Sequence, residues 1–148
     1  MANRSPDLFA FFNEIGIINQ LASTQLERLL PDGLKLAHFS VLNHFARLGG
    51  ERTPHELARA FQVTKGAITN TLQRLEARGL IAIRTNPEDG RSKLVTMTDK
   101  GGQVRDDAIA AVTPMLASLA GQLPLKEMER TLPILEEVRS ILDEARNQ

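Results

Sequence analysis

The 148-residue sequence contains no cysteine, tryptophan or tyrosine, and phenylalanine alone supplies its 4% of aromatic residues. Without cysteine, the chain cannot form a disulfide, a thiolate metal site or a cysteine-based oxidation sensor, and this absence is typical of a reducing compartment. No apolar run approaches the roughly 18 residues of a membrane-spanning helix. Residues 1–12 lack the basic start and long apolar core of a signal peptide. We therefore expect a cytoplasmic protein that does not contact a membrane.

The sequence also lacks the short motifs of the common enzyme classes. It has no Gly-x-Ser-x-Gly, no phosphate-binding loop and no dinucleotide fingerprint. The acid pairs at 106–107 and 136–137 are adjacent, so the two members of each pair do not share a helix face. His38, His44 and His55 are not spaced as metal ligands on one helix. We predict that the protein is not an enzyme, has no catalytic residue, and uses neither a metal nor a cofactor.

Charge of neither sign dominates, since the formal net charge is zero, but the charges are distributed unevenly. Residues 52–105 carry ten Lys/Arg and five Asp/Glu, a net charge of +5, and the rest of the chain carries eight and thirteen, a net charge of −5. A localised basic segment indicates a surface for a polyanion. The apolar content of 42% is sufficient for a core, and the length favours one domain or a domain with an appendage.

Four long helices are predicted from apolar residues that recur at three- and four-residue steps. They cover residues 7–30, 35–48, 99–120 and 125–145. Between the second and third, residues 53–56 (Thr-Pro-His-Glu) predict the start of a short helix with a capping box. Thr64 then caps a helix over residues 65–78, which ends at Gly79. Two helices joined by so tight a turn predict a helix-turn-helix.

Two short strands are predicted after the helix-turn-helix, at residues 80–85 and 93–98. The segment between them, NPEDGRS, is rich in turn-forming residues, so the strands form a hairpin. A helix-turn-helix followed by a hairpin is a winged helix. The predicted fold is therefore mainly α with a small β-hairpin wing, flanked by N- and C-terminal helices.

The helix over residues 65–78 has one narrow apolar stripe. At about 100° per residue, the buried positions are Ile68, Leu72 and Leu75, and the opposite side carries Gly66, Asn70, Gln73 and Ala77 and no acid. Small residues let a DNA duplex approach, and amide side chains pair with adenine edges in the major groove. Lys65 and Thr69 are placed to reach phosphates, which a helix N-terminus also favours. We predict that this is a recognition helix.

The predicted hairpin tip adds cationic side chains. Arg91 and Lys93 lie at the tip with Arg84 nearby, and an arginine at a loop tip can enter a narrow minor groove. Asp89 would repel a phosphate if it were free, so we expect it to orient a neighbouring arginine. The predicted DNA-binding residues are Thr64, Lys65, Gly66, Thr69, Asn70, Gln73, Arg74, Arg84, Asp89, Arg91, Ser92 and Lys93.

Three stretches of the sequence resemble the MarR family, the multiple-antibiotic-resistance type of bacterial transcriptional regulator. They are ELARAFQVTKGAITNTLQRLEARGLI (residues 56–81), the wing pattern DGRSKLVTMTDKG (residues 89–101) and LKLAHFSVLNHFARLGG (residues 34–50). Met97 stands where leucine is usual in the family. The wing pattern is the most specific of the three, and the outer ends of the chain match in layout rather than in motif.

The resemblance implies a homodimer in which the first and last helices of two chains interleave. It predicts a winged helix-turn-helix DNA-binding module at residues 34–99 and a helical dimerisation region formed by residues 1–33 and 100–148. The partner is then double-stranded DNA with a near-palindromic operator. We expect the protein to be a transcriptional regulator, and a repressor in preference to an activator.

The family also often binds a small aromatic acid or phenolic effector, which weakens DNA binding. Phe12, Ile15, Phe39 and Leu42 are the candidates to line such a cavity, and His38 is the candidate to anchor a polar group. The alternative for these five residues is an ordinary packing role. The alternative for the whole protein is a winged-helix protein–protein interaction module without DNA binding, whose exposed helix face touches a protein with little salt dependence.

Overall fold

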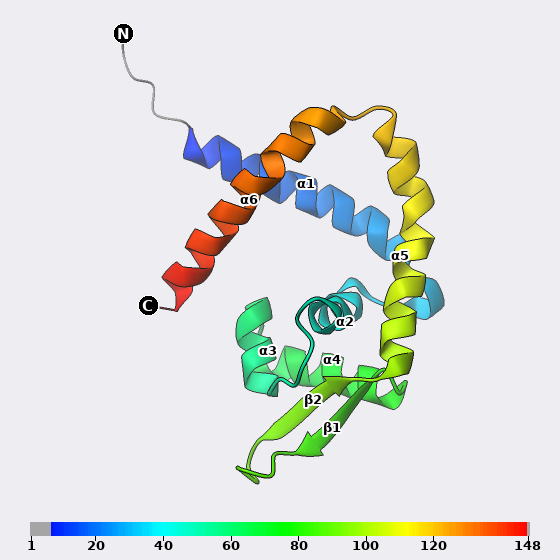
Figure 1. The fold of residues 1–148 in the computed structure, drawn as a ribbon, viewed down its shortest axis with the longest axis vertical. Coiled ribbons are helices and arrows are strands. Elements are labelled where there is room, and N and C mark those ends of the chain that lie inside the picture. The colour runs from blue at the N-terminus through cyan, green and yellow to red at the C-terminus, as the bar shows by residue number, and fades with distance from the viewer. Residues whose placement is uncertain (1–6, 148) are drawn as a thin grey trace. The chain divides into compact units, whose positions relative to one another are not determined.

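The structure, a computed structural model, describes residues 7–147 (Figure 1). Its elements are α1 (Leu8–Leu29), the 3-10 turn η1 (Pro31–Gly33), α2 (Leu36–Leu48), α3 (Pro54–Phe61), α4 (Lys65–Ala77), β1 (Ile81–Thr85), β2 (Lys93–Met97), α5 (Asp99–Ala120) and α6 (Leu125–Arg146). The expected mainly α fold with a two-stranded wing is confirmed, and the long helices, α4 and the strands lie within one residue of their predicted bounds. No helix among the described residues is both long and apolar enough to cross a bilayer.

Side-chain caps fix where most of the helices begin. Asp7, Thr53, Thr64 and Thr98 each accept a hydrogen bond at 3.0–3.1 Å from the backbone N–H three residues later. Such caps satisfy N–H groups that have no partner inside the helix. The predicted capping box at α3 is only half correct. The Glu56 carboxylate accepts from the Thr53 hydroxyl at 3.2 Å instead of from the Thr53 backbone N–H.

The core lies where α2, α3 and α4 meet the wing. Its buried members are Val41, Leu42, Phe45, Leu57, Ile68, Leu72, Leu75, Leu80, Ile81 and Val95. The predicted buried stripe of α4 is therefore confirmed, because Ile68, Leu72 and Leu75 are each at most 3% exposed. Burying a large apolar side chain stabilises the fold by about 1.5–3 kcal/mol. Burial of these three side chains therefore holds α4 with its polar face toward solvent.

The wing is an antiparallel hairpin attached to the rest of the winged helix along one edge. β1 pairs with β2 in the register Ile81↔Met97 to Thr85↔Lys93. On the other edge of β2, Arg52 exchanges two backbone hydrogen bonds with Val95, at 3.0 and 2.8 Å. The segment before α3 therefore acts as a short third strand, which places the base of the wing beside the start of α3.

The junction between α4, β1 and α5 is tightly packed. The Thr98 hydroxyl donates to the Gly79 carbonyl at 2.7 Å, and Lys100 Nζ donates to the Arg78 carbonyl at 3.0 Å. Gly79 has φ +72°, a left-handed conformation that suits glycine at the end of a helix. A Cβ at Gly101 would lie only 2.0 Å from the Leu80 carbonyl oxygen. The start of α5 thus packs directly on the backbone that follows the predicted recognition helix.

The chain divides into two compact units, with the boundary inside α5 between Val112 and Thr113. The first unit contains the whole winged helix together with α1, which the Glu27 carboxylate ties to α2 by accepting from the Leu36 N–H at 3.0 Å. The second contains the end of α5 and α6. The predicted assignment of residues 1–33 and 100–148 to dimerisation stays a prediction.

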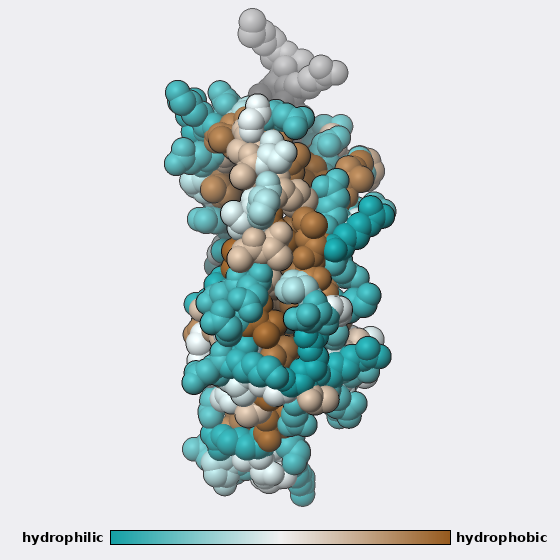
Figure 2. Space-filling model, turned by 90° about the vertical axis from the view of Figure 1, so that its right-hand side faces the viewer, coloured by the Kyte–Doolittle hydropathy of each residue, from teal (hydrophilic) through white to brown (hydrophobic). Residues whose placement is uncertain are grey.

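Helices α1 and α6 have no buried residue. On α1, Phe9, Ile18 and Leu21 are between 62% and 80% exposed, and on α6, Leu132 and Ile141 are more than half exposed. Figure 2 shows apolar side chains reaching the surface among polar ones on the face it presents. Exposed apolar surface of this extent is typical of an interface with another chain.

Candidate nucleic-acid interface

Helix α4 presents its polar side to solvent, as predicted. Gly66, Asn70, Gln73 and Ala77 are all exposed. The space around Gly66 is open, since an added Cβ would meet no atom within 4 Å. Nothing in the protein's own packing therefore requires a glycine at this position, although a close approach by another molecule would.

A hollow of about 550 Å³ lies between α4 and the wing. It is lined by Thr53, Pro54, His55, Lys65, Thr69, Leu72, Gln73, Glu76, Ile83, Arg91, Ser92 and Lys93. Six of these residues were predicted to bind DNA, namely Lys65, Thr69, Gln73, Arg91, Ser92 and Lys93. The fold therefore brings residues from two separate sequence segments to one concave surface.

The cations of this hollow are not engaged in ion pairs with the described residues. Within residues 7–147, no carboxylate lies in ion-pair distance of Lys65, Arg91 or Lys93, and all three residues are exposed. Lys93 Nζ only donates a long hydrogen bond, 3.4 Å, to the Thr85 hydroxyl. A concave surface that carries free positive charge concentrates the electrostatic field and attracts polyanions.

Glu76 was not among the predicted site residues, although it lies beside the exposed strip of α4. It lines the hollow and has no ion-pair partner among the described residues. The signal was available in the spacing, because Glu76 follows Thr69 by seven residues and so lies on the same side of the helix. The acid-free face is limited to the strip formed by Gly66, Asn70, Gln73 and Ala77.

The tip of the wing, residues 86–92, is held by its own hydrogen bonds. Asn86 Nδ2 donates to the Ser92 hydroxyl at 3.0 Å, and Asn86 Oδ1 accepts from the Glu88 N–H at 3.0 Å. Asp89 contacts the backbone of Arg91, so its expected role in orienting an arginine side chain stays a prediction. Its carboxylate accepts from the Arg91 N–H at 3.0 Å. The Arg91 side chain thus extends from an ordered turn and remains exposed.

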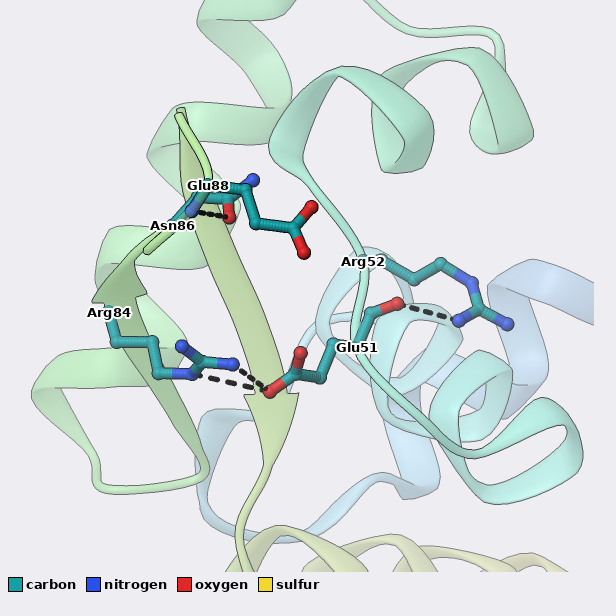
Figure 3. A network of polar contacts seen from close by, with 5 residues as sticks. All are labelled: Glu51, Arg52, Arg84, Asn86 and Glu88. Atoms are coloured by element: carbon teal, nitrogen blue, oxygen red, sulfur yellow. Dashed lines mark hydrogen bonds and ion pairs between the residues drawn. The ribbon is translucent and has the colours of Figure 1, made fainter. Parts of the chain in front are cut away.

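Arg84 differs from the other predicted cations because it is paired. Its Nε and Nη2 both donate to Oε1 of Glu51, at 3.2 and 2.5 Å (Figure 3). It does not line the hollow between α4 and the wing. The sequence reasoning missed Glu51, since the two residues are 33 positions apart and no local motif connects them. Of the remaining predicted contacts, Thr64 caps α4, and Arg74 is exposed on α4.

The five candidate effector residues do not line any of the three hollows that we describe. Leu42 is fully buried in the core, so it is not available to a ligand without repacking. Phe12 is 44% exposed, while Ile15 and Phe39 are half-buried. A second hollow lies beside α1 and α2 and is lined by Ser23, Thr24, Glu27, Arg28, Lys35 and Leu36. A third lies between α2 and α4 and is lined by Leu36, Ala37, Ser40, Val41, Phe61, Val63, Ala67, Ile68 and Thr71.

His38 has a structural partner. It is 8% exposed, and its Nδ1 accepts from the Lys35 N–H at 3.1 Å at the start of α2. Burial lowers the pKa of His38, and the positive charges of Arg78 and Arg74 lower it further. The ring therefore favours the neutral form, which keeps Nδ1 as an acceptor. This contact supports the alternative reading of His38 as a packed histidine.

Comparison with known proteins agrees with this geometry. The family described as "MarR family" matches residues 32–92. Among solved structures, a mutant of MarR from E. coli is 29% identical over 85% of this chain and 93% of that chain, with a TM-score of 0.74. The transcriptional regulator BldR from Sulfolobus solfataricus is 25% identical over 90% of this chain and 95% of that chain, with a TM-score of 0.78.

A third similar structure is mutant MarR from E. coli complexed with operator DNA. It is 29% identical over 89% of this chain and 98% of that chain, with a TM-score of 0.65. BldR is a transcriptional regulator, and the family match covers α2, α3, α4, β1 and the tip of the wing but ends before β2. Residues 32–92 therefore match the MarR family, and the chain shares the winged-helix fold of these regulators.

Proposed function

We propose that the protein is a dimeric regulator that binds a specific double-stranded DNA operator. The observation that carries the proposal is the hollow between α4 and the wing. An exposed amide of the helix lines it together with three cations that form no ion pair within the described part of the chain. The operator-bound structure of the E. coli relative supports it, since 89% of this chain aligns with that protein.

Helix α4 would enter the major groove with its exposed strip. A groove about 12 Å wide admits an α-helix, and bidentate amides there recognise adenine. Asn70 and Gln73 supply those amides, while Gly66 and Ala77 keep the strip thin. Arg91, on the ordered tip, would reach the adjacent minor groove or its phosphates. The phosphate strand between the two grooves would then pass along the hollow.

A dimer is supported by the exposed apolar sides of α1 and α6, which have no buried residue within the described chain. Covering them with a second copy would remove this surface from water, at about 25 cal/mol per Å² of apolar area. Two copies of α4 related by a two-fold axis would read half-sites about one helical turn, roughly 34–36 Å, apart. The operator is then a near-palindrome.

Repression, and its relief by a small aromatic acid or phenolic, complete the proposal. A regulator that covers a promoter site blocks transcription by occupying it. An effector releases the DNA only if it binds better to a conformation that does not hold DNA. The tight junction of α5 with Leu80, immediately after α4, is one place where a movement of the flanking helices would reach the recognition helix.

Selection from a random DNA pool tests the proposal. We expect the recovered sequences to share an inverted repeat, to which the protein binds in a strongly salt-dependent way. Lys65, Arg91 and Lys93 from two subunits give about six phosphate contacts, so affinity should fall by about 10³-fold between 50 and 200 mM salt.

Arg91→Ala should weaken binding to all sequences, whereas Asn70→Ala should cost about 1–3 kcal/mol of discrimination at one base.

The negative control for groove binding is Gln73→Glu, which keeps the size of the side chain and adds one charge. It should abolish operator binding, because a carboxylate in place of this amide repels the duplex. Operator binding that survived Gln73→Glu would refute the placement of α4 in the groove. A pool without a shared sequence, together with weak salt dependence, would instead favour a winged helix that binds another protein.

A further inference from the structure

A salt bridge joins the wing to the connection between α2 and α3. Arg84 on β1 donates from Nε at 3.2 Å and from Nη2 at 2.5 Å to a single carboxylate oxygen of Glu51. Figure 3 shows the Arg84 side chain reaching across β2 toward Glu51. The contact forms only when the hairpin lies against the segment before α3, so it reports the position of the wing.

The remaining attachments of the wing are at its base. Arg52 pairs with Val95 on the edge of β2, which leaves β1 as the outer strand. Among the described residues, the side-chain hydrogen bonds of the tip, residues 86–92, stay within the tip. The Glu51–Arg84 contact thus adds a polar side-chain link between the outer strand and the body of the winged helix to the apolar packing of Ile81 and Ile83 on the core.

We propose that Glu51 and Arg84 form a clamp that positions the wing beside α4. Arg84 then supports DNA binding by holding the wing in place, and it does not bind phosphate itself. This inference rests on the proposed function. The Glu51 carboxylate already compensates the Arg84 guanidinium, and moving Arg84 to a phosphate would leave that carboxylate unpaired near DNA. Arg91, by contrast, has no ion-pair partner among residues 7–147 and lines the hollow.

The clamp is tested by measuring operator affinity at several salt concentrations. The variants compared with the wild type are Glu51→Gln, Arg84→Gln and the swapped double variant Glu51→Arg/Arg84→Glu. Half-exposed ion pairs contribute modestly, so each single variant should weaken binding by about 5-fold. The swapped variant should recover to within about 2-fold of the wild type. Arg84→Gln should keep the wild-type dependence of log K on log salt, while the control Arg91→Gln should lower its slope by about 1 per lost phosphate contact.

Three results would overturn the clamp. They are tighter binding by Glu51→Gln, a salt slope lowered by Arg84→Gln as much as by Arg91→Gln, and a swapped variant that binds more weakly than both single variants. Each would show that Arg84 contacts phosphate. Amide hydrogen exchange of residues 86–92 in the free protein provides a separate measurement. It should be faster in both single variants and restored by the swap, and unchanged exchange would refute the clamp.

The exchange measurement also separates the two proposals. If the wild-type protein bound no DNA from the random pool, the proposed function would fail. Faster exchange in both single variants, with recovery in the swap, would still show that Glu51 and Arg84 hold the wing.

Discussion

Two neighbouring glycines at the start of α5, Gly101 and Gly102, look equivalent in sequence, but substitution by alanine should affect the stability of the protein very differently at the two positions. A Cβ at Gly101 would lie 2.0 Å from the Leu80 carbonyl oxygen and 2.9 Å from Met97 Cγ, whereas one at Gly102 would meet only Met97 Cε at 3.7 Å. Ordinary contact begins at 3.4 Å, so Gly101→Ala requires α5 and Leu80 to separate by about 1.4 Å. The obstacle is backbone, which cannot rotate away as a side chain can.

Overpacking of this kind costs about 1–3 kcal/mol, and we expect the upper part of that range for Gly101→Ala. Gly102→Ala should be neutral or stabilise the helix by up to about 1 kcal/mol, because alanine is the better helix former. The two single-methyl variants should therefore differ by about 2–4 kcal/mol in the free energy of unfolding. At roughly 2–4 °C per kcal/mol, their unfolding midpoints should lie about 10 °C apart.

Thermal and urea unfolding followed by circular dichroism measure this difference, with Gly102→Ala as the matched control. Since Leu80 lies between α4 and β1, Gly101→Ala should also weaken operator binding at temperatures where the variant is still folded. Equal stability of the two variants would refute the close packing of α5 on Leu80. Loss of stability without any loss of DNA binding would show that the junction does not position α4.

Three further predictions follow from the same structure. Gly66→Ala should leave the unfolding midpoint unchanged or raise it, because the added Cβ meets nothing within 4 Å, yet it should weaken operator binding measured by fluorescence anisotropy. Leu21→Asp and Leu135→Asp should yield monomers in sedimentation, whereas Asn19→Asp should remain dimeric; dimeric leucine variants would place the interface elsewhere. Burial lowers the pKa of His38 below its ordinary 6.5, so the unfolded state binds more protons. The free energy of unfolding should therefore fall as the pH drops below about 6.5, and His38→Gln should reduce this dependence in urea titrations.

Local sequence signals were sufficient for the secondary structure. The threonines at 53, 64 and 98, the glycine at 79 and the turn-rich segment 86–92 each act within a few residues of their own position. Such signals also identified the buried stripe of α4, because helical periodicity alone decides which side chains share a face. The confirmed bounds and the family resemblance both follow from this short-range information.

Contacts between distant segments could not be predicted in the same way. Glu51 and Arg84 are 33 residues apart, and nothing in their neighbourhoods indicates that they meet. Arg84 therefore looked like a free cation equal to Arg91. Leu42 looked available to an effector, although it is fully buried in the core that α2 shares with α3, α4 and the wing.

Caps, glycines and apolar spacing along the chain set which segments are helix, turn and strand, and which side of α4 is polar. Which charges remain free depends on how distant segments pack together. Docking the wing beside α4 assembled Lys65, Arg91 and Lys93 with Glu76 around one hollow, and it neutralised Arg84 with Glu51. The physical reason is that charge compensation depends on distance in space, and folding sets that distance for residues far apart in sequence.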